Sequence, residues 1–228
     1  MTNFGRGWRP SPAENPSLKL AGRLHELRSS LQFLDPDLVA ARSGISYLTV
    51  GPDRGEFHFP FWGNAVILAW PNLIAFSNTD DELPPLIQAL LLYYLITADG
   101  TPLSGKWVSF ADLPGGRMYN SAYQGYSGDE IAKVFGSNLS AFQSACLKMG
   151  GIPADVGSAS YVVWALPRLP LLVTYWLGDE DFPSSCKILF DSSATHYLPI
   201  DGCAIAGSML AGKLRSPTST DVGLKDKL

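Results

Sequence analysis

The amino-acid sequence predicts an α+β protein made of a single domain, with a mainly antiparallel sheet, a buried central helix and flanking helices. Short β-rich runs follow one another without a helix between them, and strand-like and helix-like patterns come in blocks rather than in strict alternation. The chain has 228 residues, of which 46% are hydrophobic and 17% are charged, so one large core is well supplied with apolar side chains. We expect the domain to cover residues 15–215, between flexible tails at 1–14 and 216–228.

The first third of the chain predicts a helix and then an antiparallel meander. Asn15 is a favoured capping residue and Pro16 suits the first turn of a helix, and leucines then recur at about 3.6-residue spacing as far as Leu34. A short helical turn follows Asp35-Pro36. The next β-rich runs are separated by turn residues and predict four strands, at 45–50, 56–61, 65–70 and 73–76.

A central helix and a second β-rich part come next. From Pro85 to Ala98 apolar residues occupy nearly every helical face, which indicates a helix lying deep in the fold. Two of the later apolar runs are uninterrupted, as is typical of strands in the middle of a sheet. The remaining pattern predicts strands at 106–110, 161–165, 171–177 and 187–190, helices at 129–134 and 139–149, and a last helix from Pro199.

Charge, apolar stretches and cysteines restrict the class of protein. The net charge is −4 and the pI is about 5.3, so the chain lacks the broad basic surface that phosphate contacts to nucleic acid require. The longest apolar stretch, 86–96, is much shorter than the roughly 20 residues of a membrane-spanning helix, and the first residues do not resemble a secretory signal. The 3 cysteines form no C-x-x-C pair. We therefore expect a cytoplasmic protein with no nucleic-acid or membrane partner.

The segment from Trp176 to Pro199 is the most specific in the sequence, because it gathers carboxylates, serine hydroxyls and an imidazole between two strands and a helix. Asp179, Glu180 and Asp181 offer hard oxygen ligands of the kind that Mg²⁺ or Ca²⁺ prefers. The alternative is an acidic turn that is simply solvated, as charged side chains in loops usually are. The residues alone favour neither a metal site nor a catalytic role for this turn.

Within this segment Asp191 and His196 have the most defined chemistry. A carboxylate at a strand end can orient an imidazole that follows it in the chain, and can fix its tautomer for proton transfer or metal ligation. In the alternative interpretation, Asp191, Ser192 and Ser193 cap the turn before the last helix, since such side chains favour capping positions. A serine hydrolase is not indicated, because these serines do not stand in a Gly-x-Ser-x-Gly turn.

A second candidate region is rich in loops and aromatic rings. Gly105 gives the backbone freedom, Lys106 supplies a cation and Trp107 a flat ring, a combination suited to gripping a carboxylated or phosphorylated planar ligand. The same residues also fit an ordinary turn before a strand. Residues 99–126 continue with glycines and tyrosines, and loops of this composition on a rigid scaffold often form pockets.

Three blocks of sequence together resemble one known family. They are LLYYLITADGTPLSGKWVSFADLPGG at 91–116, LPRLPLLVTYWLGDEDFP at 166–183 and ILFDSSATHYLP at 188–199. They are similar to the domain-of-unknown-function family 3786, which occurs mainly in anaerobic bacteria and archaea and some of whose members carry an added iron–sulfur domain of the type seen in corrinoid proteins. The resemblance covers roughly residues 17–214 and indicates a family without indicating an activity.

The resemblance implies three sets of candidate residues and a class of ligand. The family's association with corrinoid-using organisms implies a tetrapyrrole such as a corrinoid or haem as a small-molecule cofactor, with His196 as its axial ligand. On this basis we expect a cofactor-binding or carrier protein. The residue sets are Gly105, Lys106 and Trp107; Asp179, Glu180 and Phe182; and Asp191, Ser192 and His196.

Two other functions stay open at this point. One is a metal-assisted hydrolase, in which Asp179, Glu180, Asp181 and Asp191 bind the metal and His196 transfers protons. In that case His196, Asp179 and Glu180 are the candidate metal ligands. The other is a protein-interaction module that uses the exposed aromatic loops. Convergence of Asp191, His196 and Lys106 in the folded chain would favour a site over separate structural roles.

Overall fold

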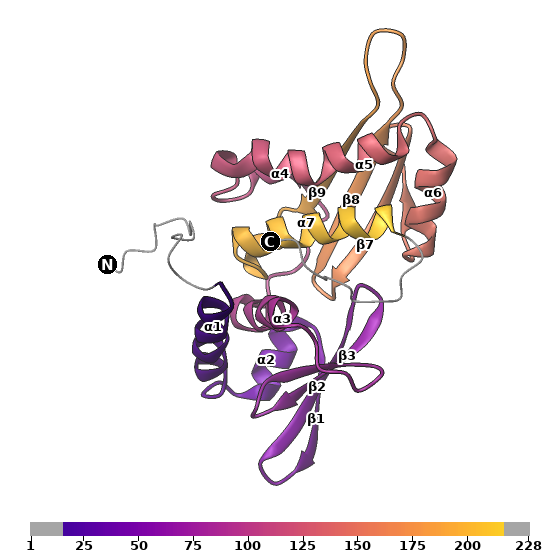
Figure 1. Cartoon of the computed structure of the whole chain (residues 1–228). Coiled ribbons are helices and arrows are strands. Elements are labelled where there is room, and N and C mark those ends of the chain that lie inside the picture. The colour runs from indigo at the N-terminus through magenta and orange to yellow at the C-terminus, as the bar shows by residue number, and fades with distance from the viewer. Residues whose placement is uncertain (1–15, 217–228) are drawn as a thin grey trace.

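The chain folds into two antiparallel sheets with helices packed around them, and the computed structural model describes residues 16–216 (Figure 1). The first lobe, residues 16–98, holds a four-stranded sheet and three helices. The second lobe, residues 99–216, holds a five-stranded sheet and the later helices. The predicted α+β class and the antiparallel pairing are therefore confirmed, with the strands divided between two sheets.

The first lobe is a meander whose inner face packs on helices. Along β2 the buried phenylalanines alternate with residues that are exposed or half-buried, so one face of the sheet turns toward the core. The last helix of the lobe, α3, packs against α1 and is buried on most of its surface, which confirms the predicted central helix. The elements are α1 (Pro16–Leu31), α2 (Pro36–Ser43), β1 (Ser46–Gly51), β2 (Arg54–Phe61), β3 (Asn64–Trp70), β4 (Ile74–Ser77) and α3 (Pro85–Thr97).

The second lobe has strand order β5-β9-β8-β7-β6, with helices on one face (Figure 1). β8 is buried along nearly its whole length, as its uninterrupted apolar sequence predicts for a central strand. Beyond the sheet, the β8–β9 connection projects as a long hairpin loop. The elements are β5 (Trp107–Ser109), η1 (Phe110–Asp112), η2 (Arg117–Tyr119), α4 (Asn120–Tyr126), α5 (Gly128–Phe135), α6 (Leu139–Lys148), β6 (Ile152–Ala154), β7 (Ala159–Leu166), β8 (Leu169–Trp176), β9 (Ser185–Asp191), η3 (Ala194–His196) and α7 (Ile200–Arg215).

One hydrophobic core joins the two lobes, and Tyr94 of α3 lies at the junction. Its hydroxyl donates to the carbonyl oxygen of Ser43 at 2.6 Å and accepts the N–H of Arg168 at 3.0 Å. Its ring stacks on that of Tyr197, with centroids 5.9 Å apart. Because these partners come from α2, the β7–β8 turn and the segment after η3, a single buried side chain ties four parts of the chain together.

The structure departs from the sequence-based prediction in a few places. The predicted loop-rich region 99–126 ends in helices, because Tyr123 is buried and stacks on Phe110 with ring centroids 4.1 Å apart. The first helix ends at Leu31, not at Leu34. The tail predicted at 1–14, and the tail predicted at 216–228 apart from Ser216, lie outside the described residues. Within residues 16–216, no helix combines the length and apolar character needed to cross a bilayer.

Candidate functional site

The candidate site lies where the loop after α3 meets the end of β9. β5 forms one edge of the five-stranded sheet and pairs with β9, with Trp107 opposite Asp191. This pairing brings the loop 98–106 beside the turn 192–197, although Ser104 and Asp191 are 87 positions apart in the sequence. Two of the three sequence blocks, 91–116 and 188–199, therefore meet at one place.

Asp191 anchors this arrangement. The residue is 2% exposed, and its carboxylate accepts hydrogen bonds from the N–H and hydroxyl of Ser104 at 3.0 and 2.9 Å, the N–H of Gly105 at 2.7 Å, and the N–H and hydroxyl of Ser193 at 2.9 and 2.6 Å. Burial by itself raises the pKa of Asp191, but the hydrogen bonds from Ser193 and Ser104 outweigh it and leave the pKa below its ordinary value. The carboxylate is thus ionised and occupied by the protein's own donors.

The loop around Ser104 is fixed by further bonds to the same turn. The Ser104 hydroxyl accepts from the N–H of Lys106 at 3.0 Å and from the hydroxyl of Ser192 at 2.9 Å. The N–H of Ser192 donates to the carbonyl oxygen of Lys106 at 2.9 Å. Gly105 has a φ of 70°, a left-handed conformation that glycine adopts at little cost. The loop is therefore held by a local network that centres on Asp191.

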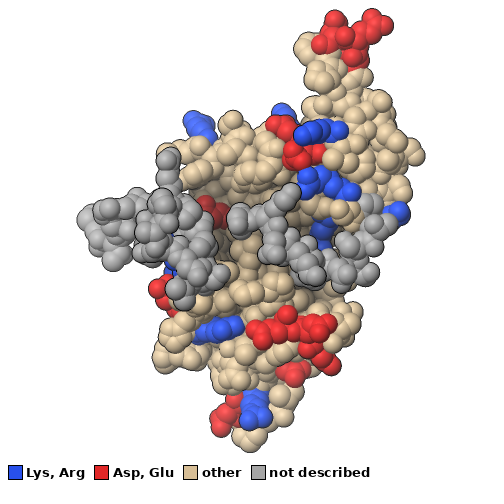
Figure 2. Space-filling view, viewed as in Figure 1, with Lys and Arg blue, Asp and Glu red and all other residues tan. Residues whose placement is uncertain are grey.

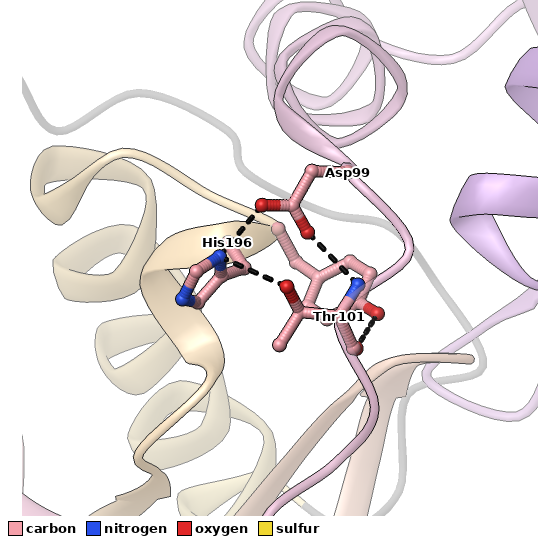
Figure 3. Close-up of polar contacts among 4 residues, drawn as sticks. Asp99, Thr101 and His196 are labelled. Atoms are coloured by element: carbon pink, nitrogen blue, oxygen red, sulfur yellow. Dashed lines mark hydrogen bonds and ion pairs between the residues drawn. The ribbon is translucent and has the colours of Figure 1, made fainter.

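His196 lies on the following turn, in η3, and faces the same loop (Figure 3). Its Nδ1 is 2.7 Å from Oδ2 of Asp99 and 3.1 Å from Oγ1 of Thr101. The other carboxylate oxygen of Asp99 accepts the N–H of Thr101 at 2.9 Å. The side chains of His196 and Asp99 are 47% and 51% exposed, so the pair is open to solvent and to a ligand.

The electrostatics of this pair determine the tautomer of the imidazole. The hydrogen bond from His196, followed by those from Thr101, holds the pKa of Asp99 well below its ordinary value. An ionised carboxylate has no proton to donate, so Nδ1 of His196 carries the proton in the pair. Nε2 of the neutral ring then keeps its lone pair, and Figure 3 shows it on the side of the ring that is turned away from Asp99 and Thr101. Such a nitrogen can bind a metal or accept a proton.

The exposed histidine stands on a rigid support. Tyr197, the next residue, is fully buried, and its hydroxyl donates to the carbonyl oxygen of Thr101. The ring of Tyr197 stacks on Tyr94 at the junction between the lobes. His196 is therefore oriented by Asp99 and Thr101 through its ring and by the core through its neighbour.

Comparison with protein-family models matches residues 35–213 to the Domain of unknown function (DUF3786). The chain belongs to this family. The matched range includes all three sequence blocks together with Asp99 and His196, so the resemblance drawn from those blocks is confirmed. A search of curated proteins and a search of solved structures each found no match.

In this DUF3786 domain the predicted pairing of Asp191 with His196 is wrong, and the capping alternative describes Asp191 better. His196 pairs with Asp99, 97 positions earlier, while Asp191 accepts the N–H of Ser193 two residues on, which is an Asx turn. Sequence reasoning missed Asp99 and Thr101. The available signal was the polar Asp-Gly-Thr sequence directly after a buried helix, in the first of the three blocks.

Lys106 directly follows Ser104 and Gly105, the loop residues that donate to Asp191, and Trp107 begins β5. Lys106 enters the network through its main chain, and its side chain is exposed. Trp107 is half-buried at the start of β5. Asp191, Lys106 and His196 therefore do converge, but their roles differ, because Asp191 is saturated by hydrogen bonds while the Nε2 of His196 is open.

In the DUF3786 domain the acidic turn 179–181 lies at the opposite end of β9 from Asp191. Asp179, Glu180 and Asp181 stand in the projecting β8–β9 hairpin, where Figure 2 shows a red cluster at the tip. β9 is 7 residues long, so about 20 Å of strand separates the hairpin from Asp191. His196, Asp179 and Glu180 therefore do not form one metal site, and the hydrolase set that adds Asp181 and Asp191 is not assembled. Across residues 16–216, no group of three or more His, Cys, Asp or Glu side chains is arranged to hold a metal ion.

The hairpin has the geometry of a solvated acidic turn, which was the alternative to a metal site. The carboxylate of Asp179 accepts the N–H groups of Asp181 and Phe182 at 3.0 and 2.9 Å. Phe182 is 71% exposed and lines a groove of about 690 Å³ between the hairpin and α5. This groove lies away from His196, so the second candidate set belongs to a different surface from the first and third.

Proposed function

We propose that this DUF3786 protein is a cytoplasmic cofactor-binding or carrier protein whose ligand is a tetrapyrrole such as a corrinoid or haem. The observation that supports the proposal is the His196–Asp99 pair, in which a carboxylate holds one ring nitrogen and the other nitrogen is open. Histidine is a common axial ligand of haem iron. A histidine that binds a metal usually donates its other N–H to a carboxylate, a carbonyl or water, as His196 does here.

The residues of the chain fit such a ligand in distinct ways. His196 offers Nε2 as an open ring nitrogen with a fixed tautomer, and Asp99 makes that nitrogen more basic by accepting the hydrogen bond of Nδ1–H on the other side of the ring. Asp191 holds the loop that carries Asp99 and Thr101, so it acts as a positioning residue. When bound, the metal of the ring supplies the redox or group-carrier chemistry.

The exposure of the pair suits a large planar ligand. A ring that approaches His196 meets an imidazole that is already oriented, so little conformational entropy is lost when the metal bond forms. Oγ1 of Thr101 lies 3.1 Å from Nδ1, the same ring nitrogen that contacts Asp99. This second contact opposes rotation of the imidazole about its Cβ–Cγ bond. The ligand would therefore bind at the surface, against the junction of the two lobes.

The proposal is tested by spectrophotometric titration of the purified chain with haemin and, separately, with cobinamide. We expect a stoichiometric shift of the visible spectrum for at least one of them, and we expect His196→Ala to abolish it. His25→Ala is the matched control, because His25 is an exposed histidine on α1 and should leave the titration unchanged.

A second variant separates orientation from ligation. Asp99→Asn keeps the side-chain shape of the partner but removes its charge, and loss of such a partner typically weakens metal binding by about 10–100-fold. The tetrapyrrole proposal fails when neither compound shifts the spectrum, or when His196→Ala binds as tightly as the unmodified protein.

A further inference from the structure

Two arginine side chains near the His196 site have no acidic partner. Arg42 is exposed in the last turn of α2, and Arg168 is partly buried in the turn between β7 and β8. Within residues 16–216, neither guanidinium makes a hydrogen bond or an ion pair. Other guanidiniums of the protein do bond to side-chain oxygens, namely Arg23 to Glu26, Arg28 to Gln88 and Arg215 to Glu130.

Arg42 lies directly against the loop that holds the histidine. A Cβ atom at Gly100 would be 3.7 Å from Cγ of Arg42 and 3.8 Å from its Cα. Gly100 stands between Asp99 and Thr101, which are the two partners of His196. These distances are ordinary van der Waals separations, so the stem of Arg42 lies beside the loop with room for one further side-chain atom between them.

Arg168, from the second lobe, packs against the C-terminal end of α2, the helix that carries Arg42. A Cβ atom at Gly44 would be 2.7 Å from Nε of Arg168, and Gly44 comes two residues after Arg42. The N–H of Arg168 donates to the hydroxyl of Tyr94, whose ring stacks on Tyr197. Burial raises the pKa of Tyr197, and the positive charge of Arg168 opposes that rise, as expected for a cation close to the hydroxyl.

The guanidinium of Arg168 is partly buried and has lost hydration without gaining an acceptor, which costs free energy until an anion binds, whereas Arg42 is exposed and supplies a second cation. The planar fork of arginine matches the oxygens of a carboxylate or a phosphate, and such charge-assisted bonds are roughly twice as strong as neutral ones. Arg42 and Arg168 come from two different lobes and border α2 and the Asp99–Thr101 segment, which orients His196.

We propose that Arg42 and Arg168 bind an oxyanion group, a carboxylate or a phosphate, on the ligand that His196 binds. The identity of that ligand rests on the proposed function, whereas the oxyanion site rests on the two arginines themselves. A haem carries propionate carboxylates and a complete corrinoid carries a phosphate, so either ligand class supplies the required group. The arginines would then set which side of the ring faces the junction of the lobes.

The oxyanion site is tested first without any tetrapyrrole. Thermal unfolding is measured at low ionic strength with millimolar pyrophosphate and, in a separate arm, with citrate, against sodium chloride of equal ionic strength. We expect a rise in Tm of roughly 3 °C with one of the two anions, which also shows whether the site prefers phosphate or carboxylate. The rise should be lost in Arg42→Gln, which is exposed and should fold normally, and in Arg42→Gln/Arg168→Gln. It should persist in His196→Ala and in Arg54→Gln, an exposed arginine at the start of β2.

The second arm compares haemin with its dimethyl ester, which lacks the free carboxylates. We expect Arg42→Gln to weaken haemin binding by at least about 10-fold and to leave ester binding unchanged, since loss of one charge-assisted bond costs at least about 1.4 kcal/mol, which is a factor of 10 in affinity. Equal Tm rises in the unmodified protein and the double variant, or no rise in either, would overturn the oxyanion site. If an anion raises the Tm through the arginines but no tetrapyrrole binds, the proposed function alone is refuted. If a tetrapyrrole binds equally well with and without the two arginines, the oxyanion site alone is refuted.

Discussion

Replacing Asp191 by asparagine exchanges a buried carboxylate for an amide of nearly the same shape. The amide oxygen can still accept from Ser104 and Ser193, but the amide nitrogen faces the N–H of Gly105, which loses its acceptor. An unsatisfied buried donor costs about 1–3 kcal/mol, and the remaining bonds lose the charge that strengthens them. We expect Asp191→Asn to lower the free energy of unfolding by about 3 kcal/mol.

Urea unfolding followed by circular dichroism measures this change, with Asp179→Asn as the matched control. Asp179 also accepts two main-chain N–H bonds, but it stands in the exposed hairpin loop. Surface substitutions of this kind usually change stability by no more than about 0.5 kcal/mol. A difference of less than about 1 kcal/mol between the two variants would refute the reasoning that Asp191 anchors the loop.

The difference in stability between the unmodified protein and Asp191→Asn has a predictable pH dependence. The folded-state pKa of Asp191 lies below its value in the unfolded chain, so its ionised form stabilises the fold. That contribution is fully present above the unfolded value of about 3.9 and is lost as the pH falls through the lower folded value. The stability gap between the unmodified protein and Asp191→Asn should therefore be constant from pH 5 to pH 7 and shrink below about pH 4. A gap that stays constant at acid pH would show that the charge is not responsible.

Three other outcomes follow from the packing. Tyr94→Phe removes the hydroxyl that joins Ser43 and Arg168, and thermal or urea unfolding should show a loss of about 1–3 kcal/mol. Gly116→Ala would place a Cβ 1.8 Å from a main-chain oxygen and should lower the free energy of unfolding by more than about 2 kcal/mol. Gly125→Ala, in helix α4, meets open space and should be neutral or stabilising. Equal effects of the two substitutions would contradict this packing. The 3 cysteines are buried, and burial raises the pKa of each thiol. A thiol reagent at pH 8 should therefore label none of them until the protein is unfolded. Rapid labelling of the folded protein would contradict their burial.

Elements with a strong local pattern could be predicted from the sequence. The leucine spacing located α1, the all-round apolar character of 85–98 located α3, and the uninterrupted run at 171–177 located the central strand β8. The division into two sheets could not be predicted, because it depends on pairing between Trp107 and Asp191 at distant positions. Helix α4 was missed because the burial of Tyr123, a tertiary contact, stabilises it.

The candidate site could be predicted only in part, for the same reason. Asp191 and His196 were found because both stand in one polar segment, but the partner of each lies in the loop after α3. Local spacing indicates an Asx turn at Asp191 and says nothing of Asp99, which reaches His196 through the folding of α3 against the second lobe. The convergence with Lys106 was implied by shared family motifs, not by any spacing within the sequence.

The tautomer of His196 is the most direct test of this account. A long-range ¹H–¹⁵N correlation spectrum of the histidine side chains, assigned with His196→Ala, reports which ring nitrogen carries the proton at neutral pH. The geometry of the Asp99 pair predicts a protonated Nδ1 and an open Nε2, and a mixture of tautomers in Asp99→Asn. A protonated Nε2 in the unmodified protein would contradict the account, because that nitrogen could then bind neither a metal nor a proton.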